Sequence, residues 1–155
     1  MYILQSTDFT ASQEGFLCEN GKCKKPCHCE EGWEVFGDHC YYFGTDKKSW
    51  TDAEQFCQEQ FGHLASANTK AIQDYVVKGM EGRGLDYAWF GGSDREEEGV
   101  WKWTDYTPWE FTHWGPREPN NAEGGQDCLQ YDGKWDDDRC TDNIPFVCSR
   151  NVCLE

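Results

Sequence analysis

The chain has 155 residues, the length of one domain, and carries 14 Lys and Arg against 29 Asp and Glu, a formal net charge of −15 at pH 7. This acidity argues against nucleic acid and against an anionic membrane surface as partners, because both attract Lys and Arg, and it favours multivalent cations. Ten cysteines alongside eight Trp, seven Tyr and nine Phe indicate an aromatic core stapled by disulfides, and therefore a secreted protein or an ectodomain.

Residues 1–28 are predicted to form a flexible arm that ends in a cysteine-rich loop without a periodic element. The first 17 residues lack the basic start and apolar stretch of a signal peptide, so we expect a signal to have been removed or to lie outside the given sequence. No run approaches the roughly 18 apolar residues of a membrane helix, so no membrane insertion is expected. Zinc is disfavoured because the cysteines and histidine at positions 18–29 lack C-x₂-C spacing.

Residues 29–155 are predicted to form the main domain, beginning with a hairpin of segments 33–36 and 40–43. A helix is predicted over residues 51–61, with Thr51 as N-cap and Glu54 completing a capping box, and Gly62 is predicted to stop it. Asn68 or Thr69 is expected to cap a second helix, whose end is predicted at Gly82 to Gly84. Its apolar face is Ala71, Ile72, Tyr75, Val76 and Met80.

Beyond residue 85 the pattern changes to short strands, predicted at 87–91, 100–103, 128–131, around 135 and at 146–148. Between Trp103 and Cys128 lies a stretch of 24 residues with three Pro and three Gly. An irregular stretch of that length in a compact domain is usually functional. Helices early and antiparallel strands late predict the α+β fold class.

Several segments in this order and spacing resemble the C-type lectin-like domains, over residues 29–148. The segments are Cys29–Trp33, Cys40–Phe43, Trp89–Gly92, Glu118–Asn120, Asp127–Cys128, Trp135–Asp137 and Phe146–Cys148. The resemblance is to long-form members of the Glu-Pro-Asn type. It implies a double-loop domain with two helices, small antiparallel sheets and a long calcium-binding loop, acting as one carbohydrate-recognition domain.

The same resemblance implies a disulfide framework that spacing alone does not give. The implied pairs are Cys29–Cys40, Cys57–Cys148 and Cys128–Cys140, and Cys27–Cys153 is favoured as a fourth. Cys18 and Cys23 then pair with each other or bridge to a second chain, which leaves a homodimer or higher oligomer open.

Residues 94–142 contain 14 acidic and five basic side chains. Carboxylate and amide oxygens are the ligands that Ca²⁺ prefers, although a run such as Glu96–Glu98 by itself is typical of a solvated face. The resemblance implies a cis peptide before Pro119 and Ca²⁺ as cofactor. The implied sugar-binding calcium site consists of Glu118, Asn120, Gln126, Asp136 and Asp137, including the Asp137 carbonyl. A supporting site is implied at Asp94, Glu98, Asn121, Gln126 and Asp127.

The implied function is that of a secreted, extracellular, calcium-dependent lectin that binds mannose, N-acetylglucosamine or fucose on glycans and glycoproteins. Mannose-type members usually carry Glu at the position of Gln126 and Asn at the position of Asp136. Because the acid and the amide are exchanged here, a galactose-type lectin is kept as an alternative. A receptor-, ice- or mineral-binding protein on the same scaffold is the other alternative. Trp109 and Tyr131 are candidates for stacking on a sugar, but packing roles are favoured for both. Catalysis is disfavoured because His28, His39, His63 and His113 lie in no catalytic motif.

Overall fold

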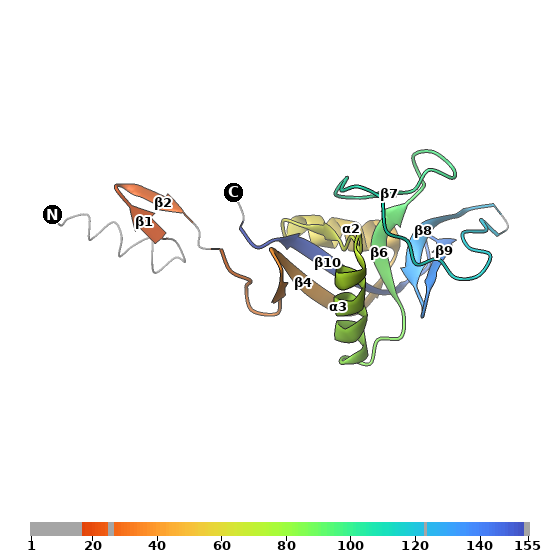
Figure 1. The fold of residues 1–155 in the computed structure, drawn as a ribbon, viewed down its shortest axis with the longest axis horizontal. Helices are drawn as coiled ribbons and strands as arrows, with labels where there is room; N and C mark the ends of the chain where they lie inside the picture. Colours follow the sequence, from red (N-terminus) through yellow and green to blue (C-terminus); the bar gives the residue numbers. More distant parts are fainter. Residues whose placement is uncertain (1–16, 25–26, 123, 154–155) are drawn as a thin grey trace.

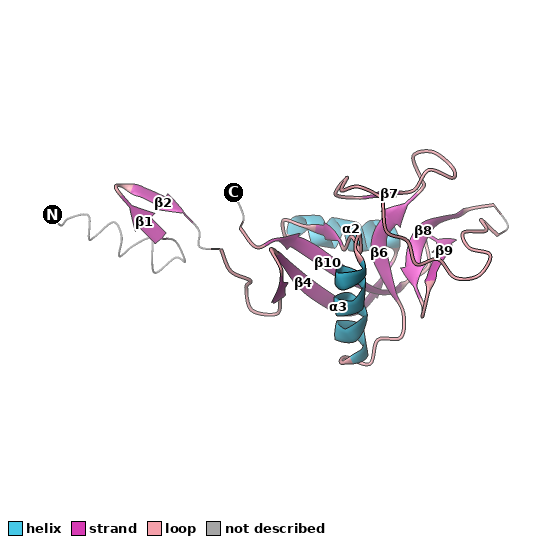
Figure 2. Ribbon diagram, in the orientation of Figure 1, coloured by secondary structure: helices cyan, strands magenta, loops and turns pink. Residues whose placement is uncertain are grey.

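The computed structural model describes residues 17–24, 27–122 and 124–153, without the side chains of residues 17–19 and 23–24. This part of the chain contains two helices and ten strands (Figures 1 and 2). The elements are β1 (Leu17–Glu19), β2 (Lys22–Lys24), β3 (Glu34–Phe36), β4 (His39–Lys48), α2 (Trp50–Glu59), β5 (His63–Leu64), α3 (Lys70–Glu81), β6 (Ala88–Ser93), β7 (Lys102–Trp103), β8 (Gln126–Tyr131), β9 (Trp135–Arg139) and β10 (Ile144–Asn151).

The main sheet has the strand order β3-β4-β10-β6-β8-β9, with β5 attached to β10 and β7 attached to β6. The α+β class is confirmed, but the expectation of purely antiparallel sheets is wrong at one pair. Strand β10 runs parallel to β6, with Phe146 opposite Trp89, while the pairs β3–β4, β4–β10, β6–β8 and β8–β9 are antiparallel. The C-terminal strand enters the centre of the sheet, where β4 and β6 run in opposite directions, so it is parallel to one of them.

Helix α2 begins one residue before the predicted N-cap. Ser49, not Thr51, caps the helix by accepting a hydrogen bond from the Asp52 N–H at 3.2 Å. Glu54 therefore forms no capping box and is instead buried, because it lies on the face of the helix that packs against the domain. The helix ends at Glu59, and Phe61 reverses the chain with a left-handed φ of 68° just before Gly62.

Helix α3 confirms the second predicted helix. Thr69, one of the two expected caps, accepts a hydrogen bond from the Ile72 N–H at 3.1 Å, and Gly82 is the C-cap. The predicted apolar positions Val76 and Met80 are buried in the core, together with Gln73 from the same face. The spacing of apolar residues thus located this helix to within a residue of its ends.

Two hydrophobic clusters make up the core of the main domain. One contains Phe90, Trp103 and Trp135, and the other contains Trp50, Trp89 and Phe146. The described residues contain four disulfides: Cys27–Cys153, Cys29–Cys40, Cys57–Cys148 and Cys128–Cys140. These are the pairs that the resemblance implies. Cys57–Cys148 joins α2 to β10 within the second cluster.

The cysteine-rich segment was expected to contain no regular element, and this expectation is wrong. Strands β1 and β2 form an antiparallel ladder across the turn at Asn20 and Gly21, both with left-handed φ values. The ladder sets Cys18 opposite Cys23, but their side chains lie outside the described part of the structure, so their pairing stays a prediction. The expected flexible arm at residues 1–16 also lies outside it. Neither α2 nor α3 is long and apolar enough to cross a membrane.

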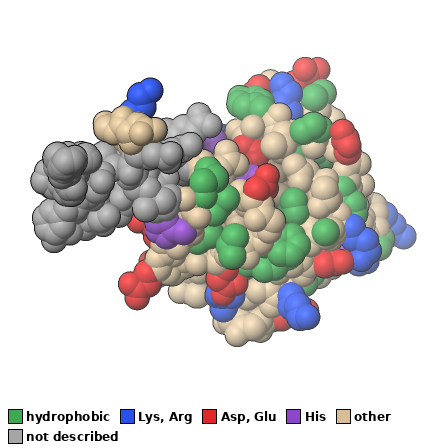
Figure 3. Space-filling model, turned by 60° about the vertical axis from the view of Figure 1, so that its left-hand side comes forward, with side chains coloured by type: hydrophobic (Ala, Val, Ile, Leu, Met, Phe, Trp, Pro, Cys, Tyr) green, Lys and Arg blue, Asp and Glu red, His purple; other side chains and the backbone are tan. Residues whose placement is uncertain are grey.

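Acidic side chains are spread over the face of the molecule in Figure 3, interspersed with hydrophobic and a few basic ones. Strands β8 and β9 lie at one end of the domain, together with the long irregular connection that joins the end of β7 at Trp103 to the start of β8 at Gln126 (Figure 1). We call this segment the connection. That end receives most of the predicted ligand residues.

Candidate functional site

Three carboxylates, from Glu118, Asp136 and Asp137, meet where the long connection returns to β9. Each contributes an oxygen, and these oxygens all lie within 4.8 Å of one another. Asp136 and Asp137 are consecutive residues of β9, and Glu118 approaches from the connection, where it forms the cis peptide bond with Pro119. We call these three residues the loop carboxylate group.

Asp137 is the fixed point of the loop carboxylate group because its side chain also holds the connection in place. It is only 1% exposed, and its two carboxylate oxygens accept hydrogen bonds from the backbone N–H groups of Asn120 at 3.1 Å and Asn121 at 2.5 Å. The Asn120 side chain donates to Glu118 Oε2 at 3.2 Å, which joins its amide to the same group. The strand and the connection are thereby locked together through one side chain.

The charges of the loop carboxylate group are poorly compensated within the described chain. Burial first, and then the neighbouring Asp137 and Asp136 carboxyls, raise the pKa of Glu118 to about 7. Burial also raises the pKa of Asp136, and repulsion from Asp137 adds to it. Glu118 Oε1 is buried and has no hydrogen-bond partner among the described residues. Crowded carboxylates with a bare buried oxygen fit a hard cation such as Ca²⁺.

A second set of three carboxylates, from Asp94, Glu98 and Asp127, lies at the paired ends of β6 and β8. Their oxygens also lie within 4.8 Å of one another. One Asp94 oxygen accepts a hydrogen bond from the Gly99 N–H at 2.8 Å, while the other and Asp127 Oδ1 are buried without a partner among the described residues. Burial raises the pKa of Asp94 to about 7, with the Glu98 and Asp127 carboxyls adding to the rise. This arrangement also fits a cation.

Two of the expected ligands, Asn121 and Gln126, are placed close to these groups but contact the connection itself. Asn121 Oδ1 accepts hydrogen bonds from the Gly125 and Gln126 N–H groups, both at 2.9 Å. Gln126 Oε1 accepts one from the Ala122 N–H at 3.1 Å. Their amide oxygens therefore accept backbone N–H groups of the connection. The structure brings together the six expected carboxylates in two groups and adds Asn120 to one of them.

The aromatic candidates for sugar stacking pack within the protein instead. The Trp109 ring lies 4.5 Å from that of Trp103 and 5.6 Å from that of Trp135, between ring centroids. Tyr131 stacks on Phe90 at 5.7 Å. Trp101, expected in a strand, lies just before β7 and contacts Trp114 edge-on at 4.9 Å. Trp109 and Trp114 belong to the connection between β7 and β8, so their packing on Trp103 and Trp135 in this tryptophan cluster anchors the connection to the core.

Sequence reasoning missed the role of the backbone in this site. Nothing in the residue pattern shows that Asp137 receives the Asn120 and Asn121 N–H groups, because that contact joins residues 16 and 17 positions apart. It also missed a separate cavity formed by residues of α2, β5 and the segments around β7, which are dispersed along the sequence and form no motif.

Comparison with known proteins places this chain among binding proteins rather than enzymes. Residues 46–150 match the family model described as the lectin C-type domain. The chain is 40% identical over 124 residues to human C-type lectin domain family 17, member A, which covers 79% of this chain and 32% of that protein. It is 34% identical over 159 residues to human C-type lectin domain family 10 member A, covering 97% of this chain and 48% of that protein. The chain thus spans only about a third to a half of these relatives.

Solved structures give the same fold. The cow carbohydrate-recognition domain of CD23, crystallised in the presence of a GlcNAc2Man3 oligosaccharide, aligns with a TM-score of 0.75 and 32% identity, over 83% of this chain and all of that chain. A calcium-independent type II antifreeze protein aligns with a TM-score of 0.71 and 31% identity, over 79% of this chain and 94% of that chain. The fold therefore occurs both with sugar ligands and with a ligand of another class.

Proposed function

Because this chain belongs to the family of C-type lectin domains, we propose that it is a secreted, calcium-dependent lectin that binds mannose-type sugars through a vicinal diol. The observation that carries the proposal is the loop carboxylate group, with its buried Glu118 oxygen that lacks a partner in the described chain. A protein of the same fold that needs no calcium has no requirement for such a group.

Ca²⁺ would be held by Glu118, Asn120, Gln126, Asp136 and Asp137, the last also through its carbonyl, and when bound would offer coordination positions to two neighbouring sugar hydroxyls. The chain's own residues then orient the sugar. The carboxylates of Glu118 and Asp136 accept the hydroxyl protons, and the amides of Asn120 and Gln126 donate to the hydroxyl oxygens. Asp94, Glu98, Asn121, Gln126 and Asp127 would hold a supporting ion beneath the connection.

Affinity chromatography of the whole chain tests this function directly. We expect retention on mannose-agarose in calcium and complete release by a chelator, because the diol would have no other strong point of attachment. Retention that survives the chelator would contradict the calcium mechanism. Calcium binding without retention on mannose- or galactose-agarose would instead support the receptor-, ice- or mineral-binding alternative, which the antifreeze neighbour illustrates.

The exchanged pair Gln126 and Asp136 is expected to set the sugar preference. The two residues lie on the antiparallel strands β8 and β9 without being register partners, because Gln126 lies opposite Arg139 and Asp136 opposite Gln130. With both as ligands of the same ion, exchanging an acid for an amide between them would move acceptors from one hydroxyl of the diol to the other. Combining Gln126→Glu with Asp136→Asn should shift the mannose-to-galactose affinity ratio about tenfold toward mannose. Each single change should weaken calcium binding instead.

A glycan array read with and without calcium measures this shift. The matched control is Gln55→Glu with Asp132→Asn, which makes the same changes of side chain at two exposed positions. The specificity argument fails if the Gln126/Asp136 variant and the wild type give the same array profile while both bind calcium.

Weak binding by one domain would gain avidity from several sites on one assembly. Among structures of the same fold, that of the Kupffer cell receptor Clec4f is described as trimeric. We therefore propose that this chain forms a homodimer or a higher oligomer.

A further inference from the structure

A cavity of about 510 Å³ lies between α2, strand β5 and the segments on either side of β7. None of the six clustered carboxylates lines it, although Ser93 and Arg95, the neighbours of Asp94, do. This volume is in the range of small-ligand pockets. The lining residues that matter for its chemistry are Trp50, Glu54, His63, Arg95, Lys102 and Tyr106. We refer to it as the Trp50–Tyr106 cavity.

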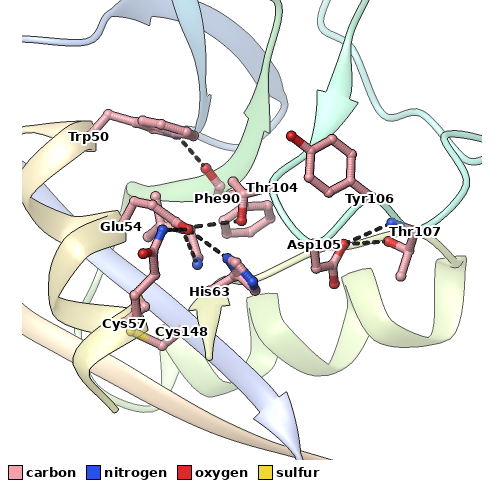
Figure 4. Close-up of polar contacts among 12 residues, drawn as sticks. Trp50, Glu54, Cys57, His63, Phe90, Thr104, Asp105, Tyr106, Thr107 and Cys148 are labelled. Carbon is pink, nitrogen blue, oxygen red and sulfur yellow. Dashed lines mark hydrogen bonds and ion pairs between the residues drawn. A yellow bond between two sulfur atoms is a disulfide. The ribbon is translucent and has the colours of Figure 1, made fainter. Parts of the chain in front are cut away.

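The buried carboxylate in the cavity is fully engaged by the protein. Glu54 accepts hydrogen bonds from the Leu64 N–H at 2.8 Å, Thr104 Oγ1 at 3.2 Å and Gln58 Nε2 at 2.7 Å, and it contacts His63 Nδ1 at 2.6 Å (Figure 4). This last contact raises the pKa of His63 and so favours its cationic form. The floor of the cavity therefore holds the Glu54 carboxylate, whose acceptors are used by the protein, next to the His63 imidazole.

The remaining charged groups of the cavity leave donors available to a ligand. Arg95 is exposed, lies over the Trp50 ring at 5.3 Å and donates one hydrogen bond, to Thr51 Oγ1 at 3.2 Å, among the described residues. A guanidinium has five N–H donors. Lys102 contacts Glu96 at 3.3 Å in an exposed pair, which holds its ammonium only weakly. Glu54 and Glu96 also line the cavity; Glu54 is engaged by His63 and by protein donors, and Glu96 contacts Lys102 and Tyr106, so Arg95 is the basic group with the most free donors.

The mouth of the cavity carries an exposed aromatic ring on a strained backbone. Tyr106 is 72% exposed and has a left-handed φ of 60°, a conformation that costs a non-glycine residue free energy and is often kept for function. Its hydroxyl donates to Glu96 Oε2 at 3.3 Å, which fixes the ring beside the opening. Figure 4 shows Trp50 and Tyr106 on either side of the Glu54, His63 and Thr104 group.

We infer that the Trp50–Tyr106 cavity is a second ligand site, which takes a saccharide ring bearing a carboxylate or a sulfate. The anionic group binds the Arg95 guanidinium and the Lys102 ammonium, and the apolar face of the ring packs on Tyr106. None of these residues belongs to either carboxylate group, so this site does not depend on the proposed diol site.

Nuclear magnetic resonance of the whole, calcium-saturated chain reads the two sites separately. The probes are glucuronic acid and N-acetylglucosamine 6-sulfate, each compared with its uncharged counterpart, glucose or N-acetylglucosamine. We expect the charged probes alone to shift the Trp50 indole N–H and the Tyr106 amide signals, while the Asn120 side-chain signal reports the diol site. Response to only one charged probe supports the proposal and identifies the anion. No shift at Trp50 and Tyr106, or equal shifts with uncharged sugars, overturns it.

Surface variants test the assigned contacts without disturbing the core. Arg95→Gln combined with Lys102→Gln should weaken binding of the effective probe about tenfold. Lys47→Gln with Arg117→Gln, two exposed basic residues outside the cavity lining, should not. Tyr106→Phe should bind nearly as well as the wild type, and Tyr106→Ala should bind more weakly. If both double variants weaken binding of the probe equally, the loss comes from the change in overall charge, and the proposed contacts of Arg95 and Lys102 are wrong.

Discussion

Asp137→Asn is expected to lower calcium affinity about 100-fold or more and to abolish calcium-dependent sugar binding. The substitution keeps the size of the side chain but removes the charge and half of its acceptor capacity. Asp137 is the most buried member of the loop carboxylate group and accepts the Asn120 and Asn121 N–H groups, so it both binds the ion and positions the connection that supplies Glu118. Outer residues of metal sites already cost 10–100-fold when changed, so a direct ligand of this kind should cost at least as much.

Isothermal titration with Ca²⁺ and chromatography on mannose-agarose measure the two effects of Asp137→Asn. Asp132→Asn is the matched control, because this substitution removes the same charge at an exposed position of the turn between β8 and β9. The assignment of Asp137 is wrong if both variants retain wild-type calcium affinity.

Trp135→Ala is expected to destabilise the domain by about 3–5 kcal/mol. The Trp135 ring is completely buried, contacts the rings of Trp103, Trp109 and Trp114, and donates its indole N–H to Gln73 Oε1 at 3.0 Å. The alanine variant leaves a cavity in the tryptophan cluster and removes the partner of a buried amide. Because Trp135 directly precedes Asp136, calcium affinity should fall as well.

Urea unfolding with the disulfides intact measures the loss of stability. Trp135→Phe keeps most of the ring volume but loses the donor, so its expected cost is smaller, about 1–3 kcal/mol for the unsatisfied Gln73 acceptor. Val35→Ala, at a residue that is 59% exposed, should change the free energy of unfolding by less than about 0.5 kcal/mol. A cost of Trp135→Ala no greater than that of Val35→Ala would show that the cluster does not support the fold.

The two helices show which features the local residue pattern predicts and which it does not. Apolar spacing located α3, and one of its two expected caps is correct, because Val76 and Met80 share one buried face; the predicted apolar position Ala71, in the first turn, is exposed. The same reasoning placed the N-cap of α2 two residues late. Thr51 and Glu54 satisfy the capping pattern, but Glu54 is drawn into the interior by the Leu64 N–H and the His63 ring, contacts formed by a strand that follows the helix. A buried partner outweighs a surface cap worth about 1 kcal/mol.

The candidate site divides in the same way. Chemistry and order of residues, read through the resemblance, named all six carboxylates that the structure gathers into its two groups. The tertiary structure decided which residues hold the two groups in place. Asp137 accepts backbone N–H groups from the connection, and the amide oxygens of Asn121 and Gln126 accept further N–H groups of the same connection.

By itself, the sequence determined the α+β class, the two helices, most strands of the main sheet and the concentration of acid late in the chain, because these follow from local periodicity and composition; it missed β1, β2 and β5. Only the tertiary structure decided the parallel pairing of β10 with β6, the enclosure of the tryptophan cluster and the Trp50–Tyr106 cavity. Each of these joins residues that are distant along the chain, and the free energy of such contacts depends on how the whole core closes rather than on any neighbouring pattern.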